Sequence, residues 1–99
     1  MSNIEKKEAL IEKLMGLKSD LKQKYFVAKI GVFGSFARDE ATVDSDIDLL
    51  VQFSKPVGFE FCALKLFLEE QMNRPVDLVT IKALRPQLTK DVLSEVIYL

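Results

Sequence analysis

Segments with strand-like and helix-like spacing of apolar residues alternate along this chain, and that order limits the folds it can adopt. Strands are expected where β-branched residues or alternating apolar side chains predominate, over residues 27–33, 47–53 and 76–81. Helices are expected before, between and after them, over residues 2–24, 35–39 and 59–72 and from Pro86 onward. The pattern predicts an α/β or α+β fold in which helices pack on a small mixed sheet of three or more strands.

Polar residues mark the expected starts of two helices. Ser2 and Glu5 have capping-box spacing at the start of the first helix. Ser35 is placed to cap the short helix that follows Gly34. The last helix is expected to carry an apolar face made of Leu88, Val92, Val96 and Ile97.

The expected helix over residues 59–72 is apolar on two sides. Its first stripe consists of Phe59, Cys62, Ala63 and Leu66, and its second stripe of Phe61, Leu64, Leu68 and Met72. The first stripe would cover the sheet and the second would meet another chain, or the whole helix would be buried in the core.

Size and charge exclude several classes of protein. The 99 residues have room for one domain, 1–99, which buries a limited share of its surface, so a homo-oligomer or a partner protein is a reasonable supplement. A formal net charge of -1 lacks the positive excess that binds duplex nucleic acid. No apolar run approaches the roughly 20 residues that cross a bilayer, and the N-terminus has no hydrophobic signal core. We therefore expect a cytoplasmic protein that does not enter a membrane.

The chain has no histidine and a single cysteine, Cys62. These counts exclude a His/Cys zinc cluster, a histidine general base and an internal disulfide. Any catalysis must therefore use carboxylates, hydroxyls, lysines or a hard metal ion.

Three aspartates form the first part of a candidate site. Asp46 and Asp48 are two residues apart, so in an extended strand their side chains point to the same face, close enough to share a cation. Asp77 stands among apolar residues, where an ionised carboxylate is costly unless it is paired or bound to a metal. If their strands are neighbours, the three carboxylates form a cluster, and such hard ligands favour magnesium, manganese or calcium.

Residues after the first expected strand form the second part of the candidate site. Gly34 and Ser35 lie where this strand turns into a helix, and their backbone N–H groups and the hydroxyl suit a phosphate. Arg38, about one turn later, either reaches a phosphate or is an ordinary surface arginine. Ser45 either touches the phosphates or stabilises a turn.

The pattern Gly-Ser, ten residues, Asp-x-Asp and a later strand Asp resembles that of the nucleotidyltransferases of the DNA polymerase beta superfamily. The segment GSFARDEATVDSDIDLLVQF is similar to the minimal nucleotidyltransferases, stand-alone domains often encoded beside a HEPN-type RNase. The resemblance extends from about Ile30 to Val79 and implies the polymerase beta-like fold. One departure is Asp39, where relatives commonly carry Gly, because it adds negative charge near the expected triphosphate site.

The resemblance implies transfer of AMP from ATP to a hydroxyl acceptor, with release of pyrophosphate and two magnesium ions. It implies that Asp46 and Asp48 bridge both ions. Asp77 would complete the shell of the ion that activates the acceptor and would accept the acceptor's proton. Gly34 and Ser35 would hold the terminal phosphates of the leaving group.

The resemblance also implies a partner, a HEPN-type toxin that this protein silences as an antitoxin by adding AMP to a tyrosine. The second apolar stripe of the helix over 59–72 is the candidate docking surface. Two alternatives stay open. One is a non-catalytic antitoxin or binding module that neutralises a partner by contact. The other is nucleotidyl transfer to a small molecule such as an aminoglycoside, for which the chain has little room.

Overall fold

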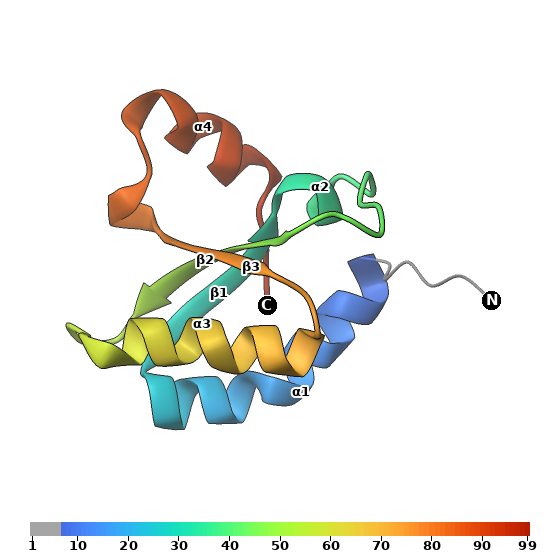
Figure 1. Ribbon diagram of the computed structural model, residues 1–99. Helices are drawn as coiled ribbons and strands as arrows, with labels where there is room; N and C mark the ends of the chain where they lie inside the picture. Colours follow the sequence, from blue (N-terminus) through green and yellow to red (C-terminus); the bar gives the residue numbers. More distant parts are fainter. Residues whose placement is uncertain (1–6) are drawn as a thin grey trace.

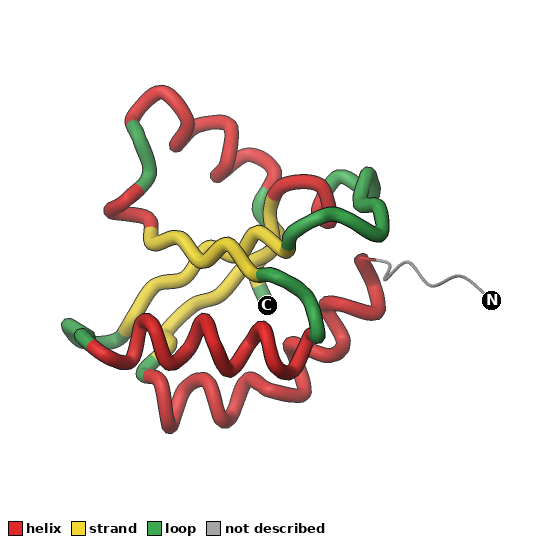
Figure 2. The backbone as a smooth tube through the Cα atoms, viewed as in Figure 1, coloured by secondary structure: helices red, strands yellow, loops and turns green. Residues whose placement is uncertain are grey.

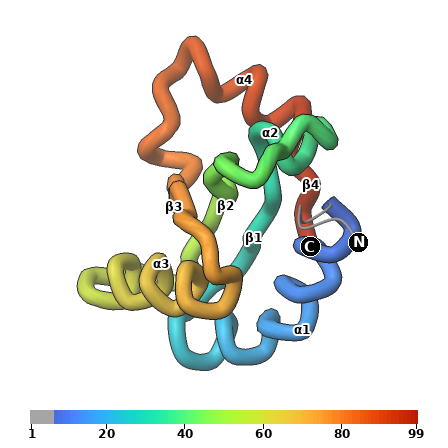
Figure 3. The backbone as a smooth tube through the Cα atoms, turned by 45° about the vertical axis from the view of Figure 1, so that its right-hand side comes forward, coloured from blue at the N-terminus to red at the C-terminus, as the bar shows by residue number. Residues whose placement is uncertain are grey.

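The strands form one mixed sheet in the computed structural model of the protein, which describes residues 7–99 (Figure 1). They are β1 (Val27–Phe33), β2 (Ile47–Phe53), β3 (Val76–Thr80) and β4 (Ile97–Tyr98), in the order β3-β2-β1-β4 (Figure 3). The helices are α1 (Lys7–Tyr25), α2 (Gly34–Ala37), α3 (Phe59–Met72) and α4 (Pro86–Glu95), with a short 3-10 helix, η1 (Ile81–Ala83), before α4. The predicted mixed sheet flanked by helices is confirmed.

The register of the sheet places residues of three strands side by side. β1 and β2 are antiparallel, and Phe33 at the end of β1 pairs with Asp48. β2 and β3 are parallel, and Asp48 pairs with Asp77. The carboxyl end of β1 therefore meets the amino ends of β2 and β3 at one end of the sheet.

Helices α1 and α3 cover one face of the sheet, and Figure 2 shows both below the yellow strands. The side chains of Ile47, Leu49 and Val51 point from β2 toward these helices and are almost completely buried. They pack against leucines of α1 and α3, namely Leu10, Leu14, Leu21, Leu64 and Leu68. Because side chains alternate along a strand, Asp48 points to the opposite face, on whose side α4 lies in Figure 1.

Two predicted strands and one predicted helix have the bounds that the structure shows, over 27–33, 47–53 and 59–72. The predicted strand over 76–81 ends one residue early, because Ile81 begins η1. The predicted capping pair, Ser2 and Glu5, lies outside the described residues. Among the helices described within 7–99, none combines the length and apolar character that crossing a membrane requires.

The start of α2 differs from the prediction. The helix begins at Gly34 with Phe33 as its N-cap and without a side-chain cap, so Ser35 lies inside it. The chain turns at Gly34, whose φ is 72°, and not at Ser35, so the helix starts one residue before the predicted one. The helix also ends at Ala37 instead of Asp39. The prediction that Ser35 caps α2 is wrong.

The structure contradicts both alternatives for α3, because the helix is not wholly buried and its two stripes are oriented the other way round. The second stripe points into the core, because its members are buried or partly buried: Phe61, Leu64, Leu68 and Met72. The first stripe faces solvent, with Phe59 92% and Leu66 65% exposed. Both sides of α3 are apolar, and the side with bulkier residues fills the space beside α1 and the sheet. The prediction that the second stripe forms a docking surface is therefore wrong.

Leucine-to-alanine variants on the two sides of α3 test this orientation. Leu64→Ala is expected to lower the free energy of unfolding by about 2–5 kcal/mol, because it leaves a cavity in the core. Leu66→Ala, the matched control, is expected to change it by less than about 0.5 kcal/mol. Urea unfolding followed by circular dichroism measures both values. A larger loss for Leu66→Ala than for Leu64→Ala would show that α3 is turned the other way.

The C-terminal residues differ from the predicted helix. α4 ends at Glu95, and Ile97, predicted to lie on the helix, belongs to β4 and pairs with Val32 at the edge of β1. The run Val96 to Tyr98 combines β-branched and aromatic residues, which favour strands. The free edge of β1 offers unpaired backbone groups to this run. The sheet formed by the described residues therefore has four strands, in agreement with the predicted three or more, and β4 is the strand that the sequence pattern did not locate.

Candidate active site

Asp48 and Asp77 lie side by side where β2 and β3 begin. They are register partners on neighbouring parallel strands, and such strands are about 4.8 Å apart. Asp46 directly precedes β2 and is exposed, as is Asp77, whereas Asp48 is half-buried. The predicted cluster depended on the two strands being neighbours, and the structure places them so.

The negative charge of Asp48 is poorly compensated by the protein. The pKa of Asp48 is raised to about 6, first by burial and then by the charges of Asp77 and Asp46. Arg38 lowers this pKa, whereas the Glu95 carboxylate raises it. A carboxylate with a raised pKa holds its charge at a free-energy cost, which an added cation would relieve. The electrostatics of this end of the sheet therefore favour cation binding.

The three aspartates have the donor chemistry of a hard-metal site but are not gathered around one point. No ion pair formed within residues 7–99 involves Asp46, Asp48 or Asp77. Among the described side chains, no three of the His, Cys, Asp or Glu types are grouped so that they could hold a metal ion as they stand. Carboxylate oxygens without a positive partner are ligands that magnesium prefers. The donor set therefore fits a divalent cation such as magnesium.

Gly34 turns the chain from β1 into α2 beside Asp48. Its φ of 72° lies in the left-handed region that favours glycine. A Cβ atom at this position would overlap the Oδ2 atom of Asp48. Only a residue without a side chain lets the backbone of this turn come so close to the carboxylate. The backbone of the turn therefore helps to determine the position of the Asp48 carboxylate.

A carboxylate from α4 binds the same turn. The backbone N–H of Gly34 donates to Oε1 of Glu95 at 3.0 Å. Nη1 of Arg38 donates to Oε1 and Oε2 of Glu95 at 3.2 and 3.0 Å, and Nε of Arg38 donates to Glu40 at 2.8 Å. Hydrogen bonds to Glu40, and then to Glu95, raise the pKa of Arg38. The Gly34 N–H that was expected to be free for a phosphate is therefore engaged.

The two serines of the predicted site lie in different settings. Ser35 is in the first turn of α2, where backbone N–H groups have no partner within the helix. The Ser45 hydroxyl accepts the N–H of Thr42 at 2.8 Å and closes the turn before β2. Nη1 of Arg74 donates to three carbonyl oxygens of this turn, those of Thr42, Val43 and Ser45, at 3.1, 3.2 and 2.8 Å. Ser45 and Arg74 thus shape the segment that leads to the aspartates.

Sequence reasoning missed the roles of Glu95 and Arg74. Glu95 is 61 residues from Gly34, and Arg74 is 29 residues from Ser45, so no local spacing connects either pair. One signal could have drawn attention to Glu95: it is an acid directly before the apolar run 96–99. The same argument identified Asp77, an acid among apolar strand residues.

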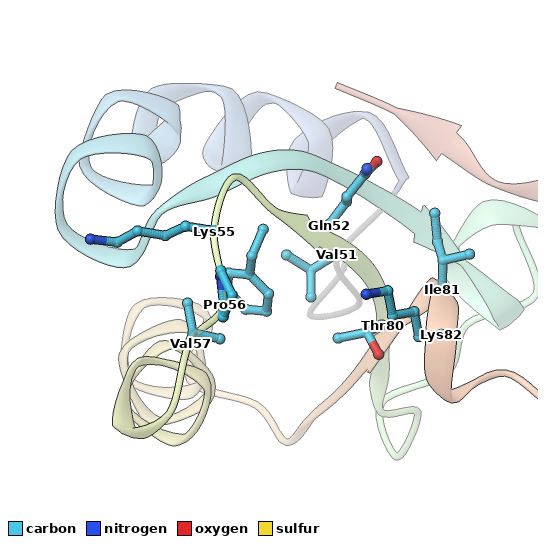
Figure 4. Close-up of a pocket in the computed structure, with 9 residues that line it drawn as sticks. Val51, Gln52, Lys55, Pro56, Val57, Thr80, Ile81 and Lys82 are labelled. Carbon is cyan, nitrogen blue, oxygen red and sulfur yellow. The ribbon is translucent and has the colours of Figure 1, made fainter.

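A cavity of about 450 Å³ lies at the other end of β2 and β3 (Figure 4). Its walls include Val51, Phe53, Pro56, Val57, Thr80 and Lys82. None of the predicted site residues lines this cavity, so the candidate active site lies on the sheet end that carries the aspartates.

Residues 14–99 match the family model described as a nucleotidyltransferase domain. The chain belongs to this nucleotidyltransferase family. The matched range contains the Gly34 turn and all three aspartates. This nucleotidyltransferase is therefore an enzyme that acts on a nucleotide substrate.

Relatives of the nucleotidyltransferase support a finer classification. A protein adenylyltransferase of Thermococcus cleftensis, MntA, is 43% identical over 82 residues, covering 82% of this chain and 83% of the relative. A solved structure assigned to the minimal nucleotidyltransferases matches with a TM-score of 0.83 at 36% identity, covering 99% of this chain and 100% of the other. The predicted minimal nucleotidyltransferase fold is confirmed.

A third match is a chain in a solved complex of a tri-AMPylated Shewanella oneidensis HEPN toxin with an MNT antitoxin. The TM-score is 0.66 at 20% identity, and the match covers 93% of the nucleotidyltransferase and 70% of that chain. At this identity the likeness concerns the fold alone.

The backbone conformation of Asp39 is one that suits glycine. Asp39 has a φ of 58°, in the left-handed region that glycine enters without strain and that Asp tolerates better than most residues. Its carboxylate pairs with Nζ of Lys7 at 3.2 Å. The charge that Asp39 adds to the nucleotidyltransferase is therefore partly balanced by a cation from α1.

Proposed function

We propose that the protein transfers AMP from ATP to a tyrosine hydroxyl of a HEPN-type toxin, releases pyrophosphate, and so acts as an antitoxin. The observation that carries the proposal is the pairing of Asp48 with Asp77 beside the Gly34 turn. The name of the Thermococcus relative supports the reaction, and the Shewanella complex supports the class of acceptor.

The aspartates are the proposed metal ligands and catalytic residues. Asp46, Asp48 and Asp77 would hold two magnesium ions, which when bound supply charge neutralisation for the attacking and leaving oxygens. In the reaction, the acceptor oxygen bonds to the α-phosphorus while the bond from that phosphorus to the pyrophosphate oxygen breaks. The proton of the acceptor hydroxyl moves to the carboxylate of Asp77.

Residues of the Gly34 turn and α2 are proposed to hold the leaving phosphates. Ser35 offers its hydroxyl and a first-turn backbone N–H. The guanidinium of Arg38 has five N–H donors, more than its hydrogen bonds to the two glutamates use. Gly34 contributes through the shape of its turn, because its own N–H is bonded to a carboxylate. Ser45 contributes by closing the turn before β2.

One observation favours a second candidate, an antitoxin that acts by contact alone. The first stripe of α3 exposes Phe59 and Leu66. This surface lies on the helix-covered side of the sheet, opposite the face to which Asp48 points. A partner that contacted this surface alone would not reach the carboxylates. Neutralisation of the toxin would then need no ATP, whereas the proposed reaction requires it.

ATP labelled separately at the α- and γ-phosphates tests the proposal. The protein is incubated with magnesium, the labelled ATP and a HEPN-type toxin. Label from the α-phosphate alone is expected on a toxin tyrosine, identified by mass spectrometry. Label from the γ-phosphate alone would identify a kinase and reject the mechanism. Toxin neutralised without ATP would favour the contact alternative, and transfer to an aminoglycoside but not to the toxin would favour a small-molecule acceptor.

A further inference from the structure

We infer that Glu95 is a positioning residue, which holds Arg38 and the Gly34 turn in the arrangement that receives the triphosphate of ATP. The inference rests on the proposed function and deepens it. It connects the C-terminal helix α4 to a phosphate site that the sequence motif places entirely between β1 and α2.

One carboxylate binds both parts of the proposed phosphate site. Oε1 of Glu95 accepts hydrogen bonds from the Gly34 N–H and from Nη1 of Arg38, and Oε2 accepts a second one from the same nitrogen. The Glu95 side chain is 26% exposed, compared with 47% for Arg38. No residue of α4 is buried, so the end of the helix is held by β4, which follows it, and by these hydrogen bonds. Within α4, Glu95 is the residue whose side chain bonds to both the Gly34 turn and Arg38.

The hydrogen-bond donors that Arg38 has left indicate that Glu95 positions Arg38 for a phosphate and does not compete with the phosphate for it. Glu95 and Glu40 bond to Nη1 and Nε, and no residue within 7–99 accepts a hydrogen bond from Nη2, whose two N–H groups can serve an incoming anion. A guanidinium fixed at two atoms loses little further conformational freedom when it binds a phosphate. The arrangement is therefore prepared for the anion before the anion arrives.

Glu95→Gln tests this role in the full protein with its toxin acceptor. Glutamine keeps an oxygen for the Gly34 N–H but loses the charge that holds Arg38. We expect the KM for ATP to rise about 10- to 30-fold, with kcat changed less than about threefold. Equilibrium dialysis with labelled ATP and magnesium should show binding weakened by the same factor.

Two further variants separate positioning from a general structural role. Glu40→Gln is the matched control, because Glu40 also pairs with Arg38 but is 63% exposed. It is expected to change the KM less than about threefold. In an Arg38→Ala background, Glu95→Gln is expected to weaken ATP binding little further, because both substitutions remove the same interaction between Glu95 and Arg38.

Three outcomes would overturn the inference. Tighter ATP binding by Glu95→Gln would show that the carboxylate competes with phosphate. An equal loss with and without Arg38 would show that Glu95 acts on the structure in general. Unchanged ATP binding would show that Glu95 has no role in the site. If the unaltered protein neither bound ATP nor transferred AMP, the proposed function would fail as well, and that result is distinct from the other three.

Discussion

Replacing Asp48 by Asn is expected to lower AMP transfer at least about 1,000-fold and to stabilise the metal-free protein at about pH 8. The loss of activity follows from removing a proposed metal ligand that pairs with Asp77 across β2 and β3. The gain in stability follows from removing a negative charge that burial and two neighbouring aspartates disfavour. Activity and stability should therefore change in opposite directions in a single variant.

The sign of the stability change follows from the two pKa values of Asp48. The folded value, about 6, lies above the ordinary value of 3.8. The contribution of Asp48 to stability is therefore fully present below about pH 4 and is lost as the pH rises through about 6. The difference corresponds to about 3 kcal/mol, which partial exposure reduces to about 1–2 kcal/mol. Asn cannot ionise and avoids this loss.

Thermal unfolding at about pH 4 and about pH 8, with and without magnesium, measures these effects. Magnesium is expected to raise the Tm of the unaltered protein at about pH 8 more than that of Asp48→Asn, because the variant lacks one proposed ligand. Asp44→Asn is the matched control, since Asp44 is exposed and does not contribute to the pKa of Asp48. An Asp48→Asn variant that kept its activity, or was less stable at about pH 8, would contradict the assignment.

The neighbouring placement of Asp48 and Asp77 could be anticipated from local rules. Strand alternation puts Asp46 and Asp48 on one face, and an acid among apolar strand residues indicates Asp77. A strand, a helix and a second strand in succession favour parallel neighbours, as β2, α3 and β3 are. These rules identify which residues meet, but they do not determine the register that pairs Asp48 with Asp77.

Other features could not be predicted because they depend on contacts between distant segments. α3 is apolar on both sides, and only packing against α1 and the sheet decides that Leu64 is buried and Leu66 exposed. β4 forms because the run after Glu95 reaches the free edge of β1, far away in the sequence. The hydrogen bonds of Glu95 depend in turn on where β4 fixes the end of α4.

Gly34→Ala is expected to disrupt the site by adding a side chain to the backbone turn beside Asp48. The new Cβ would overlap the Asp48 carboxylate, and the φ of 72° is unfavourable for any residue with a side chain. The conformation alone is expected to cost about 1–2 kcal/mol of stability, and the overlap adds to this loss. Because Asp48 must move away, AMP transfer is expected to fall at least about 100-fold. Urea unfolding and the labelled-ATP assay measure the two effects.

Two further experiments separate the effect of the backbone conformation at Gly34 from the effect of the overlap with Asp48: a control substitution at Gly16, and Gly34→Ala in a protein that also carries a substitution at Asp48. Gly16→Ala is the matched control, because Gly16 lies inside α1 and its Cβ would meet nothing within 4 Å. It is expected to stabilise the protein by about 0.5–1 kcal/mol, the opposite sign. An Asp48→Gly background removes the whole side chain that the new Cβ would meet, so Gly34→Ala should there cost only the conformational part, about 1–2 kcal/mol. An equal cost in both backgrounds would show that the turn and the Asp48 carboxylate are not in contact, and the glycine would then serve the turn alone.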